Sequence, residues 1–313
     1  MLAKAAILGL AQSKGLEGFV RGNRLSAKAA RRFIAGEKVE EAVEAVKILN
    51  VAGISASLDL LGESVRNSQE VAVVVDTYLR LFEQMSEMGL DANVSLKLTA
   101  LGLDIDAEKC YRNVTRLLSC APTPNPKDPL NSPMFVRIDM ESSDYTQKTL
   151  DLFYRLKSEG FQNTGVVIQS YLRRSEADVQ KLIADGVRVR LCKGAYKEPA
   201  SVAFPNKSDV DANYVSLMKN LMLNGNYPGI ATHDEAIITT AKEWAKEKSI
   251  ASARYEFQML YGIRRDLQTQ LIQEGYRVRC YTPFGDHWYP YLMRRLAERP
   301  ANVMFILKSL LKP

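Results

Sequence analysis

The amino-acid sequence predicts an α/β protein, a (β/α)8 barrel with an N-terminal helical extension. Eight short apolar segments alternate along the chain with eight amphipathic segments, a pattern typical of strand–helix units in a parallel sheet. The 313 residues are enough for a barrel of about 250 residues and an addition to it. The sequence contains no G-x-G-x-x-G and no P-loop motif. Those motifs are typical of doubly wound sheets, the alternative architecture.

The first fifty residues are expected to be helical. Apolar residues recur at intervals of three and four in residues 27–33 and 39–49, and Gly36 separates the two segments. We therefore expect residues 1–50 to form the N-terminal extension and residues 51–313 to form the barrel.

Short runs rich in Val, Ile and Leu predict the strands, because strands covered on both faces are apolar throughout. They cover residues 54–61, 94–98, 134–139, 165–169, 187–192, 229–232, 253–257 and 276–281. Apolar residues with a helical period predict the helix that follows each strand. The helices cover residues 71–88, 107–118, 145–156, 176–183, 211–223, 235–246, 263–273 and 289–296. Gly89 is a suitable C-cap for the first of them.

Two long loops are expected on opposite ends of the barrel. The proline-rich residues 121–133 follow a helix and precede a strand, so they should lie at the end away from the chemistry. Residues 196–211 follow a strand and contain Pro199 and Pro205. This second loop is therefore the better candidate for a lid over a site.

Composition and charge exclude several classes of protein. The chain is 46% hydrophobic and 25% charged, which excludes a disordered or collagen-like protein. The net charge of +6 is compatible with contact to an anionic membrane surface. No block of consecutive Lys and Arg of the kind that a nucleic-acid-binding arm shows is present, so we expect no nucleic-acid partner. No apolar run reaches about 18 residues, so no membrane-spanning helix is expected.

The cysteines and histidines do not predict a metal site. The four cysteines, Cys110, Cys120, Cys192 and Cys280, form no C-x-x-C pair, and only two histidines, His233 and His287, are present. This spacing lacks the pattern of a structural zinc site. We expect reduced thiols in a cytoplasmic protein, and no metal.

Polar residues gather where the predicted strands end. In a (β/α)8 barrel these ends face one shared site, and charged groups there are costly to bury without partners. The residues concerned are Asp59, Lys97, Arg137, Asp139, Gln169, Arg188, Arg190, Lys193, Thr232, His233, Asp234, Glu256, Gln258 and Tyr281. The alternative for any one of them is an ion pair that supports the barrel floor, such as Arg137 with Asp139.

Some of these residues suggest particular ligands. Lys97 together with Arg294 and Arg295 would form a pocket for a carboxylate or phosphate, since guanidinium groups bind such anions in bidentate fashion. Gln169 offers both a donor and an acceptor, which suits the edge of a heterocycle. Small residues after the fifth strand, Gly194 and Ala195, allow a ligand to approach the backbone. His233 could be a general base or a hydrogen-bond donor.

Six local strings resemble the proline dehydrogenase family and occur in that family's order. They are SLKLTALG at 95–102, QSYL at 169–172, RLCKGAY at 190–196, ATHD at 231–234, EFQMLYG at 256–262 and YLMRRLAERPAN at 291–302. The resemblance implies a barrel whose last helix lies above it. It also implies an FAD-dependent oxidation of L-proline to Δ1-pyrroline-5-carboxylate, with electrons passed to a membrane quinone, as the first step of proline degradation to glutamate.

The resemblance also implies roles for individual residues. The proline carboxylate would bind Lys97, Arg294 and Arg295, while Tyr281 and Tyr291 would enclose the ring. Asp139 would orient residues beside the substrate, and Arg190 would lie near the reactive flavin nitrogen. The residues implied to hold FAD are Met140, Gln169, Arg190, Lys193, Gly194, Ala195, Tyr196, Thr232, His233 and Gln258.

Two alternatives to this function are open from the sequence. One is a Schiff-base lyase or aldolase with Lys97 or Lys193 as nucleophile and the paired arginines on a phosphate. The other is a non-catalytic, basic scaffold at a membrane surface. A quinone acceptor implies peripheral contact with the inner face of the cytoplasmic membrane. Residues 303–312 are expected to be amphipathic and either contact that surface or pack on the barrel.

Overall fold

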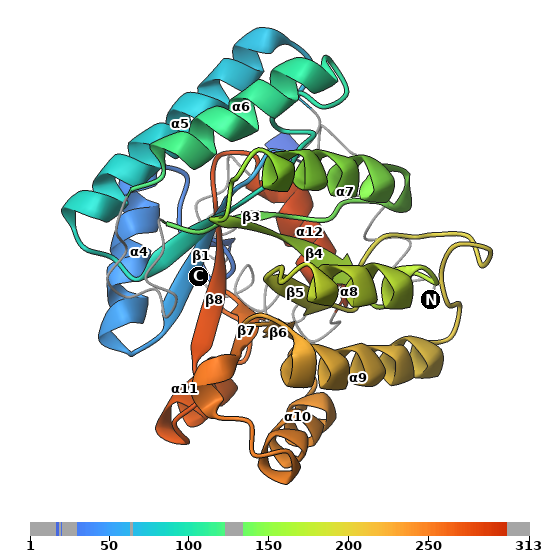
Figure 1. The fold of residues 1–313 in the computed structure, drawn as a ribbon. Coiled ribbons are helices and arrows are strands. Elements are labelled where there is room, and N and C mark those ends of the chain that lie inside the picture. The colour runs from blue at the N-terminus through green and yellow to red at the C-terminus, as the bar shows by residue number, and fades with distance from the viewer. Residues whose placement is uncertain (1–16, 19, 21–29, 63–64, 123–133, 299–313) are drawn as a thin grey trace.

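The computed structural model describes residues 17, 18, 20, 30–62, 65–122 and 134–298. Eight parallel strands form a closed barrel in sequence order, with β8 paired to β1 (Figure 1). The strands are β1 Ser55–Leu60, β2 Ala92–Leu96, β3 Val136–Ile138, β4 Thr164–Gln169, β5 Val189–Cys192, β6 Gly229–Ala231, β7 Glu256–Leu260 and β8 Val278–Phe284. The predicted (β/α)8 architecture is confirmed.

Helices alternate with the strands, and most of them cover the outside of the barrel. They are α4 Val39–Val51, α5 Ser68–Glu87, α6 Ala107–Cys120, α7 Ser143–Ser158, α8 Ser175–Ala184, α9 Lys207–Asn224, α10 Glu235–Glu247, α11 Arg265–Gln273 and α12 Trp288–Glu298. Short polar residues begin several of them: Asn67, Asp106 and Asp234 accept hydrogen bonds from the first free amides of α5, α6 and α10. Such caps satisfy backbone donors that the helix itself leaves unpaired.

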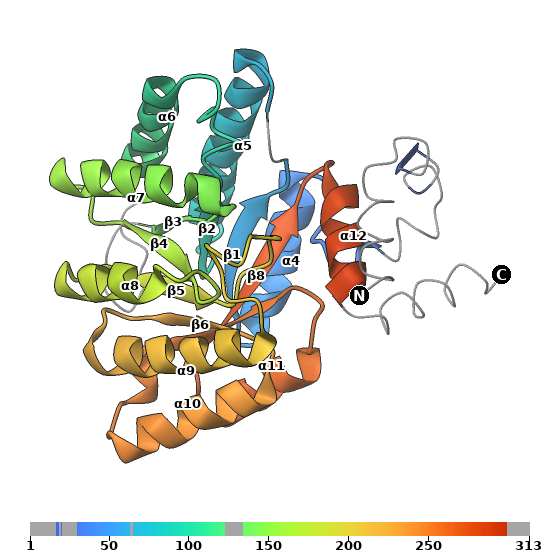
Figure 2. The same cartoon turned by 90° about the vertical axis from the view of Figure 1, so that its right-hand side faces the viewer.

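The helix before β1 takes a place in the outer ring. Its apolar face, which includes Val39, Val43 and Val46, is buried, and α4 contacts β1 and β8. The last helix, α12, lies behind the strands in Figure 1 and beside them in Figure 2. It therefore covers one end of the barrel, as the resemblance implied.

Several strands alternate between an apolar outer face and a polar inner face. Outward residues such as Leu58, Leu96 and Leu191 pack into the core beneath the helices. Their neighbours Ser57 and Arg190 point inward and bond to each other across the barrel. This two-residue period is the property of a pleated strand. The inside of this barrel is consequently rich in polar and charged groups.

Several predicted boundaries are corrected. The predicted strand 253–257 begins later, because Ser252–Arg254 form a 3-10 turn and β7 starts at Glu256. The predicted lid 196–211 ends sooner, since α9 begins at Lys207. Of the predicted helix 27–33, only Ala30 onward is described, and residues 31–33 form a turn. Residues 123–133 and 303–312 lie outside the described residues.

A glycine after β7 connects the barrel to the segment before α4. Gly262 has φ +72°, and a Cβ there would lie 1.6 Å from the carbonyl oxygen of Arg32. Gly186 has a similar φ of +66° but open space around it. The two positions therefore separate the cost of backbone strain from the cost of a steric clash.

We expect Gly262→Ala to lower the free energy of unfolding by about 3 kcal/mol or more, and Gly186→Ala by about 1 kcal/mol. Both variants carry the strain of a left-handed alanine, and only the first forces the chain near Arg32 to move. Urea denaturation of the two variants measures the difference. Equal losses would show that the contact between Gly262 and Arg32 contributes nothing to stability.

Candidate active site

A cavity of about 520 Å³ opens where the strands end. All of the residues to which the resemblance gives a role line it, so the structure brings them together, although their individual roles stay predictions. They are Lys97, Asp139, Met140, Gln169, Arg190, Lys193, Gly194, Ala195, Tyr196, Thr232, His233, Gln258, Tyr281, Tyr291, Arg294 and Arg295. Asp59 and Cys192 also line the cavity, and the sequence had assigned neither a role. Arg137, Arg188 and Glu256, which were also expected at the strand ends, do not line this cavity.

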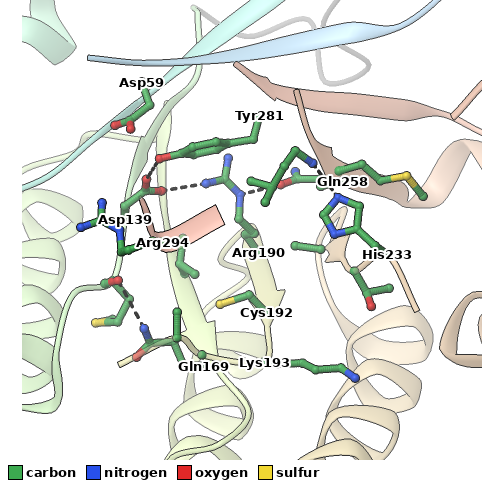
Figure 3. Close-up of a pocket in the computed structure, with 18 of the residues that line it drawn as sticks. Asp59, Asp139, Gln169, Arg190, Cys192, Lys193, His233, Gln258, Tyr281 and Arg294 are labelled. Carbon is green, nitrogen blue, oxygen red and sulfur yellow. Dashed lines mark hydrogen bonds and ion pairs between the residues drawn. The ribbon is translucent and has the colours of Figure 1, made fainter. Parts of the chain in front are cut away.

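Arg190 is fixed by three hydrogen bonds on the inner wall of the cavity, and Figure 3 shows those to Asp139 and Gln258. Its Nη1 donates to Asp139 Oδ1 at 2.7 Å and its Nη2 to Ser57 Oγ at 3.2 Å. Its Nε donates to Gln258 Oε1 at 2.5 Å. A guanidinium held on all three nitrogens cannot rotate. Arg190 therefore presents a fixed positive charge at the cavity.

Asp139 connects this arginine to the opposite wall. Its second oxygen accepts a hydrogen bond from the Tyr281 hydroxyl at 2.8 Å. The Tyr281 hydroxyl in turn lies 3.4 Å from Lys97 Nζ, which donates to it. The aromatic ring of Tyr281 is thus held in place by groups from two other strands.

Lys97 is bound chiefly by Asp59, the carboxylate at the end of β1. Lys97 Nζ lies 2.7 Å and 2.8 Å from the two oxygens of Asp59, and 3.9 Å from Asp139 Oδ2. Asp59 is 1% exposed. The sequence showed Asp59 at a strand end, but only the closed barrel places β1 beside β2 and so pairs these two residues.

The ionisation of Asp59 is unusual. Burial raises its pKa to about 6, although the Lys97 ammonium opposes this and the Asp139 carboxylate adds to it. The carboxylate form is therefore complete only above pH 6. The ion pair with Lys97 is lost as the pH falls through 6, because a neutral carboxyl group carries no charge to pair.

One expected ion pair is wrong. Arg137 was a candidate partner for Asp139, but its Nη1 donates to the backbone oxygens of Val166 and Arg188. Its guanidinium also lies 4.6 Å from the centre of the Phe135 ring. Burial, together with the charges of Arg190 and Arg188, holds the pKa of Arg137 well below its usual value. Asp139 pairs with Arg190 instead.

The tautomer of His233 is determined by the backbone. The amide of Leu260 donates to His233 Nε2 at 2.9 Å. A nitrogen that accepts a hydrogen bond carries no proton, so the neutral ring carries its proton on Nδ1. Of the two roles open from the sequence, the geometry favours the hydrogen-bond donor over the general base.

Lys193 lies at the rim of the cavity between two carboxylates. Its Nζ is 2.6 Å from Asp211 Oδ1 and 2.9 Å from Asp234 Oδ2. A Schiff-base nucleophile must be a neutral amine, whereas carboxylates bind both Lys193 and Lys97 and an anionic neighbour favours the charged amine. This geometry argues against the lyase alternative.

The loop after β5 is anchored on both sides. Gly194 has φ +102°, and a Cβ there would lie 2.2 Å from the Tyr171 ring, so only glycine fits. Farther along, the Glu198 carboxylate accepts hydrogen bonds from the backbone amide of Ser143 at 2.8 Å and from its hydroxyl at 2.5 Å. An isolated bridge joins Leu172 to Ala203. The described part of the predicted lid is therefore held against its neighbours.

Gln169 leaves one polar atom for a ligand. Its Nε2 donates to the Met140 backbone oxygen at 3.4 Å. Its Oε1 is buried and accepts no hydrogen bond from the residues that the structure describes. A buried acceptor without a partner is costly. The N–H edge of a planar heterocycle in the cavity would satisfy it.

Comparison with known proteins identifies the family. The family model described as proline dehydrogenase matches residues 42–308. The chain belongs to the proline dehydrogenase family. Proline dehydrogenase 1 of Bacillus subtilis subsp. natto is 42% identical over 99% of this chain and 100% of its own length. Proline dehydrogenase of Deinococcus radiodurans is 39% identical over 99% of this chain and 98% of its own length.

A solved structure agrees with the barrel. Proline utilization A (PutA) from Bdellovibrio bacteriovorus, inactivated by N-propargylglycine, superposes with a TM-score of 0.78 at 26% identity. The match covers 90% of this chain and 33% of that one, so this chain spans about a third of that PutA. Among the residues described here, no cluster of His, Cys, Asp or Glu could hold a metal. Within the same residues, no helix is both long and apolar enough to cross a membrane.

We expect the Asp59 carboxyl group to titrate near pH 6, about two units above an exposed aspartate. Infrared spectroscopy detects a buried protonated carboxyl as a C=O stretch. This band should grow as the pH falls through 6 and should be missing from Asp59→Asn. The control Glu141→Gln removes another buried carboxylate, which bonds to Thr99, and should keep the band. A midpoint near pH 4 would contradict the assignment.

Proposed function

We propose that this enzyme oxidises L-proline to Δ1-pyrroline-5-carboxylate with FAD and passes the electrons to a membrane quinone, which begins proline degradation to glutamate. Its family and its full-length relatives support the reaction with proline. The observation that carries the proposal is one cavity that is lined both by two arginines of α12 and by the fixed Arg190. An amino acid with one carboxylate and one oxidisable C–H bond matches this arrangement.

The arginines of α12 are suited to the substrate carboxylate. Arg294 and Arg295 both line the cavity, and a guanidinium binds a carboxylate through two parallel hydrogen bonds. Lys97 adds a third positive charge, which Asp59 holds in place. Holding the carboxylate fixes the orientation of the ring, and a fixed orientation is what hydride transfer requires.

The tyrosines enclose the substrate ring. Tyr281 and Tyr291 line the same cavity, and the hydroxyl of Tyr281 is fixed by Asp139. A wall that cannot move disfavours a ring with an extra hydroxyl group. We therefore expect preference for proline over hydroxyproline.

The residues of the cavity fit a flavin. The unsatisfied oxygen of Gln169 suits an N–H group of the heterocycle, and His233 is a donor by its tautomer. Gly194, which packs against the Tyr171 ring, lines the cavity after the end of β5. Bound FAD would supply the acceptor for the hydride, which carries the two electrons. The fixed positive charge of Arg190 would favour negative charge placed beside it.

Electron transfer to a quinone requires access to a lipid bilayer. We propose a cytoplasmic enzyme that associates peripherally with the inner face of the cytoplasmic membrane. The net charge of +6 supports attraction to anionic lipids. Residues 303–312, which lie outside the described residues, are the candidate contact segment.

The purified enzyme is expected to show an oxidised-flavin spectrum that bleaches when L-proline is added without oxygen. Arg294→Met and Arg295→Met should keep the flavin and raise KM for proline, with a loss of about 2–4 kcal/mol in kcat/KM, because the carboxylate loses a charged partner. The exposed Arg116 of α6 provides a matched control, Arg116→Met. A flavin that ignores proline would contradict the substrate. An unchanged KM would contradict the carboxylate assignment.

Membrane contact is tested by sedimentation with anionic vesicles. The full chain should sediment with vesicles that contain phosphatidylglycerol and should be released by high salt, since the attraction is electrostatic. A chain truncated after residue 302 should bind less. Equal binding by the truncated chain would show that residues 303–313 do not contribute to the membrane contact.

A further inference from the structure

A glycine in β6 separates two buried charged residues at the same level of the barrel. In the strand register, Arg190 of β5 pairs with Gly229 of β6, and Gly229 pairs with Glu256 of β7. Arg190 and Glu256 are 6% and 3% exposed. Because Gly229 has no side chain, a side chain from β5 or from β7 can occupy the space inside the barrel next to β6.

The amide of Gln258 fills this space. A Cβ at Gly229 would lie 2.4 Å from Gln258 Nε2 and 2.8 Å from its Cδ, so any larger residue would displace the amide. Gln258 follows Glu256 by two residues and shares its inward face. Gly229 is therefore required for the observed position of Gln258.

The Gln258 amide has a defined orientation. Its Nε2 donates to Glu256 Oε1 at 2.6 Å, and its Oε1 accepts from Arg190 Nε at 2.5 Å. A carboxylate can only accept, so it requires the NH2 end of the amide. The reversed amide would direct its NH2 group at the N–H of Arg190, where no hydrogen bond can form.

Glu256 is itself held as a carboxylate. Arg279 Nε donates to it at 2.8 Å, and the Tyr227 hydroxyl donates at 3.2 Å. Burial would raise the pKa of Glu256, but the Arg279 guanidinium outweighs burial and lowers this pKa to about 2. Glu256 thus stays a carboxylate, and an acceptor, at pH values well above 2.

We propose that Glu256 is a positioning residue for the reaction, which acts by fixing the Gln258 amide so that its oxygen holds Arg190 in place, with Gly229 providing the room. The inference rests on the proposed function, because it assigns Arg190 to the flavin. Glu256 lies below the cavity and touches neither substrate nor cofactor in this assignment. In this proposal its effect on Arg190 passes through Gln258.

Two substitutions break this chain of contacts in different ways. Glu256→Gln removes the charge that selects one orientation of Gln258, and Gly229→Ala displaces the Gln258 amide without changing any polar group. Tyr227→Phe is the control, because it removes a hydrogen bond from the same carboxylate and leaves Gln258 in place. Loss of stability alone would affect all three variants.

The first readout is the Arg190 Nε–H resonance of the full-length protein labelled with 15N-arginine, assigned with Arg190→Lys. This signal needs no turnover. It should shift in Glu256→Gln and in Gly229→Ala and remain unchanged in Tyr227→Phe. An unchanged signal in Glu256→Gln, or an equal shift in Tyr227→Phe, would overturn the proposal.

The second readout is steady-state kinetics with proline. We expect kcat to fall about tenfold in Glu256→Gln and Gly229→Ala, the size typical of groups that orient a functional residue, with KM within about twofold. A higher KM for proline together with an unchanged kcat would overturn the proposal. A wild-type flavin that proline does not reduce would instead contradict the proposed function, and the resonance would still decide the role of Glu256.

Discussion

Burying charges inside a closed barrel is possible only when each charge has a partner, and this constraint shapes the whole site. The desolvation of an ion costs several kcal/mol, and good geometry must offset it. Asp139 meets this need twice, since it accepts from both Arg190 and Tyr281. The ion pair of Lys97 with Asp59 lies on the opposite wall of the cavity. A ligand therefore meets groups that are already oriented.

The need for a partner also explains why the polar groups at the two ends of the barrel have different contacts. Groups near the floor, such as Arg137, are satisfied by backbone oxygens and aromatic faces. Groups at the cavity keep atoms for a ligand, of which Gln169 Oε1 is the clearest. Because α4 covers β1 and β8 from outside, α12 can lie over the strand ends and add its arginines to the site.

Much of this arrangement follows from the sequence, because all parallel strand ends in a barrel meet at one rim. From the sequence, that rule predicts that Lys97, Arg190 and Gln258 share one cavity. The rule does not predict which of these residues bond to one another. That depends on the strand register and on how far each side chain extends across the barrel. The partner of Lys97, the floor contacts of Arg137 and the late start of β7 at Glu256 all depend on such tertiary geometry.

Arg190 and Asp139 act as one unit rather than as two separate polar groups. A double-mutant cycle with Asp139→Asn and Arg190→Gln, followed by urea denaturation, measures their coupling. Groups in one buried network are not additive. The account predicts a coupling free energy of about 1 kcal/mol or more. Additive effects, within about 0.5 kcal/mol, would contradict it.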